Sequence, residues 1–259
     1  MTNNPPVLLT TDGGVARLML NQPDRYNPLS TEMITALQRA LDDIAADPGI
    51  RVVVLGGAGK AFSAGHDLKE MIGTPERGFY ETLFAACSRM MTSLTALPQP
   101  VIARVHGTAA AAGCQLVGMC DLAVASRSAR FAVSGISYGL FCSTPSVALA
   151  RNVGRKRALE MLFTGEFIDA DTAADVGLVN RAVDDADLDT EIDRLCASIM
   201  KKPAISVARG KRLFYEQVEQ PMAAAYALAE KVMADNMMDD AAQEGFRAFV
   251  EKRPPDWQK

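Results

Sequence analysis

The first part of the chain alternates short apolar runs with stretches whose apolar residues recur at helical spacing. Residues Val7–Thr11 and Val15–Asn21 flank the turn Asp12-Gly13-Gly14, a pattern that predicts two strands joined tightly. Ser30 is a suitable N-cap for a helix that carries Met33, Ile34, Leu37, Leu41 and Ile44 at helical spacing.

Further short apolar runs predict buried strands at Arg51–Leu55, Val101–Val105, Leu122–Ser126 and Phe131–Val133. Two stretches of small residues each lead into a helical pattern, at Phe62–Met71 (FSAGHDLKEM) and Gly107–Asp121 (GTAAAAGCQLVGMCD). Because strand, tight turn and helix occur twice, the sequence predicts repeated ββα or βαβ units in one α/β core.

Helical patterns dominate after about residue 145, and a short strand is predicted at Leu178–Ala182. No low-complexity linker interrupts the chain. We therefore expect one compact unit, with an α/β core over 1–195 and a helical region over 196–259. The predicted helices are roughly 145–163, 170–176, 186–201, 204–218, 221–238 and 240–252.

Charge and composition narrow the class of protein. The 259 residues include 27 basic and 31 acidic side chains, a net charge of −4, so no broad cationic surface for nucleic acid or a membrane is expected. No apolar run reaches the roughly 18–20 residues that span a bilayer. Residues 1–10 show no targeting pattern, and the five cysteines form no CxxC pair. These features predict a soluble, cytoplasmic protein with reduced thiols.

Histidine is scarce, since the chain holds only His66 and His106. A His-rich metal site is excluded, and we expect neither a bound metal nor a separate cofactor. A dinucleotide-dependent oxidoreductase is also disfavoured, because no GxGxxG follows a predicted strand.

The two stretches of small residues suggest a chemistry. Each precedes a helix, and a helix N-terminus presents unpaired N–H groups that glycine and alanine leave accessible. Two such turns that meet would place two amide donors around a developing oxyanion. For either turn alone, however, tight packing of helix on strand is the simpler explanation.

Ordered motifs along nearly the whole chain resemble the enoyl-CoA hydratase/isomerase (crotonase) superfamily. The resemblance implies the crotonase fold (ClpP/crotonase-like), a spiral of ββα units with C-terminal helices that assemble a homotrimer or a dimer of trimers. SAGHDL, AAGCQL and YGLFCSTP are most similar to the subgroup called enoyl-CoA hydratase domain-containing protein 3. The motifs are LNQP, NPLS, FSAGHDLKEM, VIARVHG, AAGCQL, CDLAVAS and GFRAFVEKRPP.

The resemblance implies an acyl-CoA ligand whose thioester carbonyl lies between two backbone amides. In this sequence these amides belong to His66 and Ala112, where the family commonly has glycine at the second position. Alanine keeps its N–H, so an oxyanion hole made of these two amides can form if the backbone dihedrals of residue 112 allow a Cβ. The resemblance also implies coenzyme A contacts, with the last two supplied by a neighbouring subunit, at Ala64, Leu68, Arg25, Phe249 and Lys252.

The two glutamates that hydratases of this family use are absent. Gln115 and Gly135 occupy their positions; the Gln115 amide cannot exchange a proton near neutral pH, and Gly135 has no side chain. General acid–base catalysis contributes a factor of roughly 10² to 10⁴ in rate for each group, so we expect hydration by the usual route to be strongly slowed. Restoring glutamate at both positions should raise hydration if residue 135 has room. The side chains that could replace the glutamates are those of His66, Asp67, Ser134, Ser137, Tyr138, Cys142 and Ser143.

The sequence thus predicts an acyl-CoA enzyme of fatty acid metabolism, a lyase of the enoyl-CoA hydratase/isomerase type that stabilises a thioester enolate. Two alternatives stay open. The chain could bind acyl-CoA without catalysis, or it could run another crotonase reaction as an isomerase, hydrolase or decarboxylase.

Overall fold

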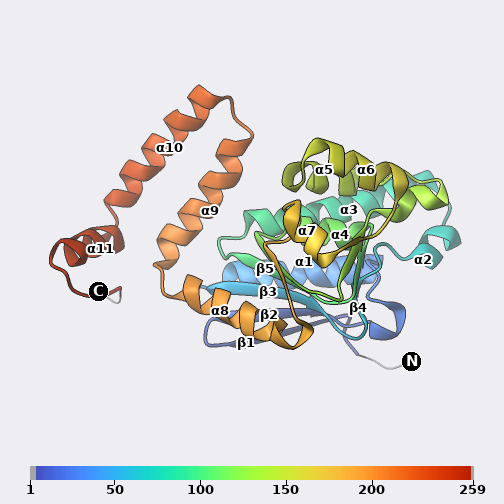
Figure 1. Cartoon of the computed structure of the whole chain (residues 1–259), viewed down its shortest axis with the longest axis horizontal. Coiled ribbons are helices and arrows are strands. Elements are labelled where there is room, and N and C mark those ends of the chain that lie inside the picture. The colour runs from blue at the N-terminus through green and yellow to red at the C-terminus, as the bar shows by residue number, and fades with distance from the viewer. Residues whose placement is uncertain (1–3, 258–259) are drawn as a thin grey trace.

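The computed structural model describes residues 4–257 and contains two β-sheets surrounded by helices (Figure 1). The larger sheet has six strands in the order β1-β2-β3-β5-β7-β10. Strands β1 and β2 are antiparallel, and the other pairs are parallel. The strands are β1 (Val7–Asp12), β2 (Val15–Leu20), β3 (Val52–Gly57), β5 (Val101–Val105), β7 (Leu122–Ser126) and β10 (Arg181–Val183).

The smaller sheet has the order β4-β6-β8-β9, and β4, β6 and β8 run parallel. The carboxyl ends of these three strands therefore meet at one edge of the sheet. The sequence predicted β8 from the apolar run Phe131–Val133 but not β4, β6 or β9, whose two or three residues carry no readable periodicity. The strands are β4 (Ala61–Ser63), β6 (Thr108–Ala110), β8 (Arg130–Ala132) and β9 (Ile168–Asp169).

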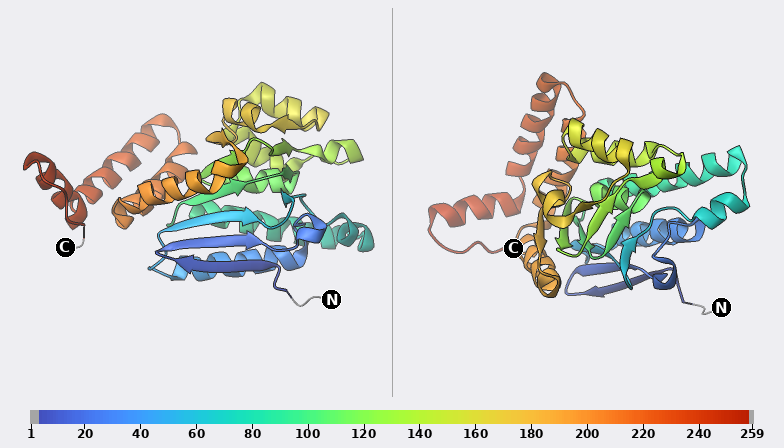
Figure 2. Two further views of the ribbon diagram at one scale, coloured as in Figure 1. Left: turned by 60° about the horizontal axis from the view of Figure 1, so that its bottom comes forward. Right: turned by 45° about the vertical axis from the view of Figure 1, so that its right-hand side comes forward.

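Both faces of the central strands β3, β5 and β7 are buried, which explains their near-continuous apolar runs. On β3, Val53 and Leu55 join the main core with helices α1 (Thr31–Ala46) and α3 (Arg77–Ala96). Val52 and Val54 point the other way and pack with helix α8 (Leu188–Met200). Figure 2 shows α8 lying across the sheet on this side.

Most predicted elements are present, with two differences. Ser30 caps α1 as expected, since its Oγ accepts a hydrogen bond of 3.2 Å from the Met33 amide. The helix predicted at 145–163 is instead two helices, α5 (Ser143–Asn152) and α6 (Arg155–Thr164), separated at Gly154. The strand predicted at Leu178–Ala182 is displaced and forms β10.

The last three helices extend away from the two sheets (Figure 1). They are α9 (Ala204–Val218), α10 (Met222–Met237) and α11 (Asp240–Val250), and α10 packs chiefly on α9. The remaining helices are α2 (Leu68–Gly73), α4 (Ala112–Met119) and α7 (Ala170–Asp175), with short 3-10 turns η1 (Pro23–Arg25), η2 (Ser134–Tyr138) and η3 (Asp185–Asp187). Residue 195 lies inside α8, and the division into 1–195 and 196–259 stays a prediction.

Candidate active site

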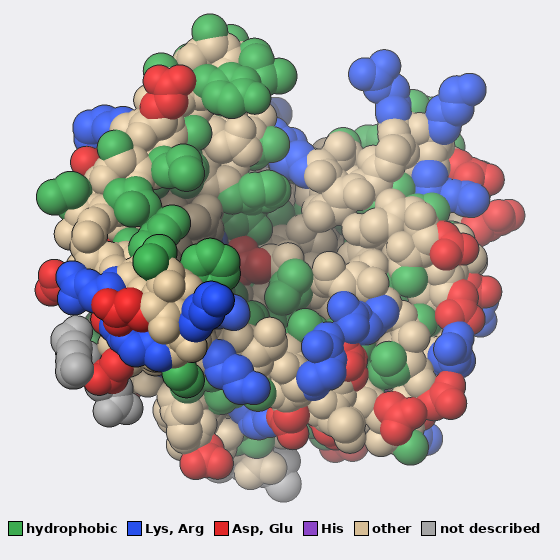
Figure 3. Space-filling view, turned by 60° about the vertical axis from the view of Figure 1, so that its left-hand side comes forward, with side chains coloured by type: hydrophobic (Ala, Val, Ile, Leu, Met, Phe, Trp, Pro, Cys, Tyr) green, Lys and Arg blue, Asp and Glu red, His purple; other side chains and the backbone are tan. Residues whose placement is uncertain are grey.

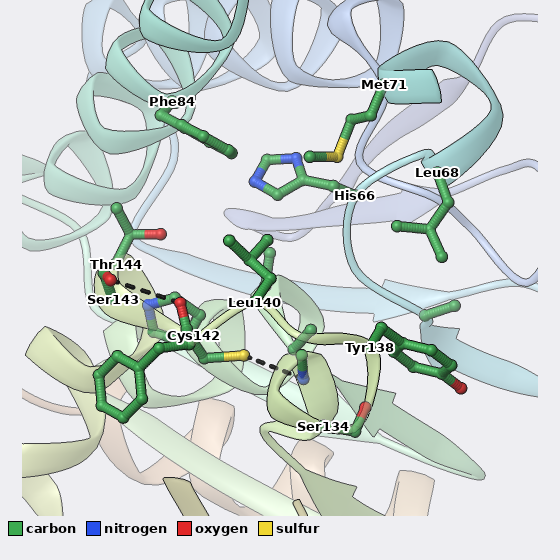
Figure 4. Close-up of a pocket in the computed structure, with 16 residues that line it drawn as sticks. His66, Leu68, Met71, Phe84, Ser134, Tyr138, Leu140, Cys142, Ser143 and Thr144 are labelled. Atoms are coloured by element: carbon green, nitrogen blue, oxygen red, sulfur yellow. Dashed lines mark hydrogen bonds between the residues drawn. The ribbon is translucent and has the colours of Figure 1, made fainter. Parts of the chain in front are cut away.

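A cavity of about 180 Å³ lies where the carboxyl ends of β4, β6 and β8 meet. Its walls come from the segments after these three strands, from α2 and α3, and from the start of α5. Figure 4 shows the lining side chains converging on one space. They are mostly apolar: Ala64, His66, Leu68, Met71, Phe84, Ala111, Ala112, Ser134, Gly135, Tyr138, Leu140, Phe141, Cys142, Ser143, Thr144 and Pro145.

The two turns of small residues meet at this cavity. Gly65 has a φ of +90°, and a Cβ there would lie 2.9 Å from the Ala110 carbonyl oxygen and 3.1 Å from the Ala112 nitrogen. At Gly113, a Cβ would lie 2.3 Å from the carbonyl oxygen of Ser63. Glycine is therefore required at both positions for close packing. The same close approach brings the two turns, each of which leads into a helix, to one wall of the cavity.

Two amide groups are available at this wall. Within residues 4–257, neither the His66 N–H nor the Ala112 N–H donates a hydrogen bond to a protein group. Ala112 is the first residue of α4, so its N–H also lies at the positive end of that helix. Ala111 before it has φ 49° and ψ −117°, a conformation that alanine seldom adopts and that costs about 1–3 kcal/mol.

The His66 side chain is fixed by a contact with the backbone. Its Nδ1 lies 3.0 Å from the Leu29 carbonyl oxygen, while Nε2 is buried with no partner among the described residues. The ring packs edge-on against Phe84, with centroids 5.5 Å apart. Burial lowers the pKa of His66 below its usual value, although the Leu29 hydrogen bond and Glu70 oppose this shift. The imidazole is therefore neutral at neutral pH.

Three residues expected to contact coenzyme A lie at or beside the cavity. Ala64 and Leu68 line it, and the Leu68 side chain is exposed. Arg25 is half-exposed and forms an ion pair with Asp67. Asp67 in turn caps α2 by accepting a hydrogen bond of 3.0 Å from the Lys69 amide.

Phe249 and Lys252 are not brought to the cavity within one chain. Phe249 lies on α11 and is 83% exposed, and Lys252 follows that helix with a φ of +54°. Figure 1 places α11 at the end of the molecule opposite α2. Their expected contact with coenzyme A stays a prediction that needs a neighbouring subunit.

The positions that lack the usual glutamates differ in their surroundings. Gly135 lines the cavity, but a Cβ there would lie 2.5 Å from the Leu140 carbonyl oxygen and 2.8 Å from Cys142 Sγ. Residue 135 therefore has no room for glutamate, and the condition for restoring hydration there is not met. Gln115 is buried on α4, its Oε1 has no hydrogen-bond partner among the described residues, and it does not line the cavity.

Cys142 and Tyr138 complete the ionisable side chains of the wall. Cys142 Sγ accepts a hydrogen bond of 3.3 Å from the Gly135 amide (Figure 4), and burial raises its thiol pKa. Tyr138 is 79% exposed. The Gly-x-Ser-x-Gly run at Gly135–Gly139 overlaps η2 and is not a strand-to-helix elbow of the hydrolase type. Across residues 4–257, no cluster of His, Cys, Asp and Glu is placed to hold a metal ion.

Comparison with known proteins assigns this architecture to a family. The family model described as enoyl-CoA hydratase/isomerase matches residues 10–259. The chain belongs to the enoyl-CoA hydratase/isomerase family. The prediction drawn from the motifs is thus confirmed, and this membership supports a hydratase-like enzyme that acts on acyl-CoA thioesters.

Solved members of the family share the fold over the whole chain. An enoyl-CoA hydratase of Mycobacterium smegmatis is 57% identical, with a TM-score of 0.98 over 99% of this chain and 100% of that one. Human enoyl-CoA hydratase domain-containing protein 3 is 42% identical, with a TM-score of 0.95 over 97% and 100%. The crotonase fold is therefore confirmed, as is the similarity to that subgroup.

Curated family members correct the expected localisation. Enoyl-CoA hydratase domain-containing protein 3 of Xenopus laevis is 44% identical over 99% of this chain and 87% of its own length, and its name calls it mitochondrial. Four further vertebrate relatives carry the same name. Our expectation of a cytoplasmic protein is wrong on this finding. Separately, no helix within residues 4–257 is long and apolar enough to cross a membrane.

Proposed function

We propose that this chain binds acyl-CoA thioesters and stabilises their enolates between the amides of His66 and Ala112. The observation that carries the proposal is that both N–H groups lie at the wall of one apolar cavity without a protein partner. A donor aimed at a developing oxyanion contributes about 3–4 kcal/mol in such a site. Low local polarity strengthens this interaction, because little water screens it.

The coenzyme A part of the ligand fits the outer end of the cavity. Backbone groups at Ala64 and Leu68 would contact it near the thioester. Arg25 would meet a phosphate with the exposed part of its guanidinium group, since its other side engages Asp67. The ligand itself supplies coenzyme A, so the proposal needs no separate cofactor.

A second function deserves a test because both expected carboxylates are missing. With Gln115 and Gly135 in their places, the chain could hold acyl-CoA without turning it over. Turnover separates the two functions, since a binding protein would saturate with acyl-CoA and show no proton exchange or conversion above background.

We further propose that the chain assembles as a homotrimer or a dimer of trimers through α9–α11. Large apolar side chains are exposed on these helices, and Figure 3 shows apolar surface gathered beside a hollow. Exposed patches of this kind mark association sites. Neighbouring copies would also bring Phe249 and Lys252 to another subunit's ligand. The exposed residues include Phe214, Met222, Tyr226, Met233, Phe246, Phe249 and Val250.

The oxyanion hole is tested with a chromophoric enoyl thioester of coenzyme A. Wild type should bind it with a red shift of its absorption band, because two donors polarise the carbonyl. Ala112→Pro removes one N–H at the first position of α4 and should lose most of the shift per bound ligand.

The matched control is Ala204→Pro, which places proline at the first position of α9 outside the cavity and should keep the full shift. Circular dichroism checks both folds. If the wild-type protein binds the thioester without any red shift of its absorption band, the proposed oxyanion hole is refuted, whatever the variants do.

A further inference from the structure

We infer that the methyl group of Ala112 holds the peptide between Ala111 and Ala112 in the orientation that directs its N–H at the cavity. Ala111 is strained in this orientation, and Ala112 prevents the peptide from rotating to relieve the strain. The inference rests on the proposed function, because the Ala112 N–H is one of the two donors that would meet the thioester oxygen.

Two hydrogen bonds fix the strained residue on both sides. The Ala111 N–H donates to the Ala132 carbonyl oxygen on β8 at 2.8 Å, and the Ala111 carbonyl oxygen accepts from the Gln115 amide at 3.0 Å. In a trans peptide, the C=O and the N–H point in opposite directions. Because the Ala111 carbonyl points along α4 toward Gln115, the Ala112 N–H points out of the helix start, toward the wall of the cavity.

The backbone of Ala111 is in a conformation that glycine normally occupies. Its φ of 49° and ψ of −117° match the first central position of a type II′ turn. A half-turn of the peptide between residues 111 and 112 would bring Ala111 into the ordinary left-handed region, which alanine tolerates better. The same rotation would turn the Ala112 N–H away and place the Ala111 carbonyl oxygen at the wall.

Ala112 opposes this rotation. It is the first residue of α4 and has the negative φ of a helix. A half-turn of the preceding peptide changes φ of Ala112 by about 180°, as in the change from a type II′ to a type I′ turn. Its φ would then be positive, in a region that glycine enters readily and alanine does not. The methyl group of Ala112 therefore keeps the donor in place although Ala111 is strained.

The orientation of this peptide decides whether the wall attracts or repels a thioester. In the rotated peptide, the carbonyl oxygen of Ala111 would face the thioester oxygen, and both atoms carry negative partial charge. A donor that is already oriented stabilises an oxyanion without reorganisation. A chain that spends part of its time in the rotated form would bind more weakly, in proportion to the fraction that is competent.

The test replaces Ala112, and then both alanines, with glycine in the full chain. Hydrogen exchange of the Gln115 amide, measured by NMR without ligand, reports the rotation, because Gln115 then loses its acceptor. The second readout is the Kd of the chromophoric enoyl thioester. Ala112→Gly alone keeps the strain and removes the restraint, so we expect exchange at least about tenfold faster and a Kd about two- to tenfold higher.

A second substitution should rescue this variant. Adding Ala111→Gly removes the strain that drives the rotation, so in the double variant both readouts should return to within about twofold of wild type. The matched control is Ala204→Gly at the first position of α9. The preceding Pro203 has an ordinary φ of −60°, and its carbonyl oxygen accepts from the Val207 amide at 3.2 Å, so exchange of Val207 should not change.

Gln115 exchange in Ala112→Gly within twofold of wild type would overturn the inference. A double variant as defective as Ala112→Gly would also overturn it, since the methyl group of Ala112 would then only fill space. Ala111→Gly alone should raise the urea midpoint of unfolding, and a lower midpoint would contradict the strain even if Ala112→Gly failed to fold. If wild type does not bind the thioester, the proposed function is refuted, whereas the exchange results still decide the orientation of the peptide.

Discussion

At His66, the backbone amide and the imidazole ring are positioned by different parts of the chain. The turn of small residues around it predicts an accessible amide, because glycine and a helix start are visible in the sequence. The state of its ring is set by the carbonyl of Leu29, which lies 37 positions away in the chain. No local pattern encodes that contact, so the unpartnered Nε2 could only be found in the structure.

Gly135 leads to a prediction opposite to the one drawn from the sequence. Gly135→Glu should not restore hydration, because its Cβ would clash with the Leu140 carbonyl oxygen at 2.5 Å. We expect a loss of about 1–3 kcal/mol in the free energy of unfolding, measured by urea denaturation. Gly78→Glu is the control, since a Cβ there meets open space. Wild-type stability in Gly135→Glu, or a gain in hydration, would contradict this prediction.

Among the elements, long periodic helices and buried strands were predictable, while three of the four strands in the sheet that builds the site, β4, β6 and β9, were not. Strands β4 and β6 have three residues each and exist because β4 pairs with β6 and β6 pairs with β8. Their pairing brings the turns at residues 64–66 and 111–112 together. The sequence contains both turns, but only tertiary structure shows that they meet.

The attachment of α9 depends on a buried cation. Lys211 is 6% exposed, and its Nζ lies 2.6 Å from Asp121 Oδ2, 2.7 Å from the Leu94 carbonyl oxygen and 2.9 Å from that of Gln99. Tyr215 on the same helix donates to Asp121 Oδ1 at 2.9 Å. All three ammonium hydrogens thus have acceptors, and α9 is fixed to the end of α3 and to the start of β7.

Lys211→Met should lower the free energy of unfolding by about 3–5 kcal/mol, because it leaves the mostly buried Asp121 carboxylate without its charged partner. Lys231→Met on α10 is the control. Its ion pair with Asp235 is exposed and 3.6 Å long, so its loss should cost less than about 1 kcal/mol. Equal effects of the two substitutions in urea denaturation would show that Lys211 does not anchor α9.

The molecule consists of a body that holds the cavity and of C-terminal helices that lie outside this body. Figure 2 shows α10 and α11 standing clear of the sheets. Ordered motifs were enough to predict the family and its fold, because they extend along nearly the whole chain. The assembly was implied only by resemblance, since exposed apolar side chains do not specify how many copies cover them.

The assembly is tested by light scattering coupled to size-exclusion chromatography. We expect a mass three or six times that of the 27.8 kDa chain. Phe246→Glu on α11 should shift the mass toward the monomer, because a charge replaces a 60% exposed apolar ring of the proposed interface. Leu8→Glu on β1 is the control for an exposed apolar residue elsewhere. A wild-type monomer at all concentrations would contradict this proposal.

The central claim is that the amides of His66 and Ala112 together hold the thioester oxygen of an acyl-CoA. A crystal structure with a bound saturated acyl-CoA analogue tests it most directly. We predict that the thioester oxygen lies about 2.7–3.1 Å from both nitrogens. A thioester oxygen bound away from either amide, with the coenzyme A part in place, would contradict the account.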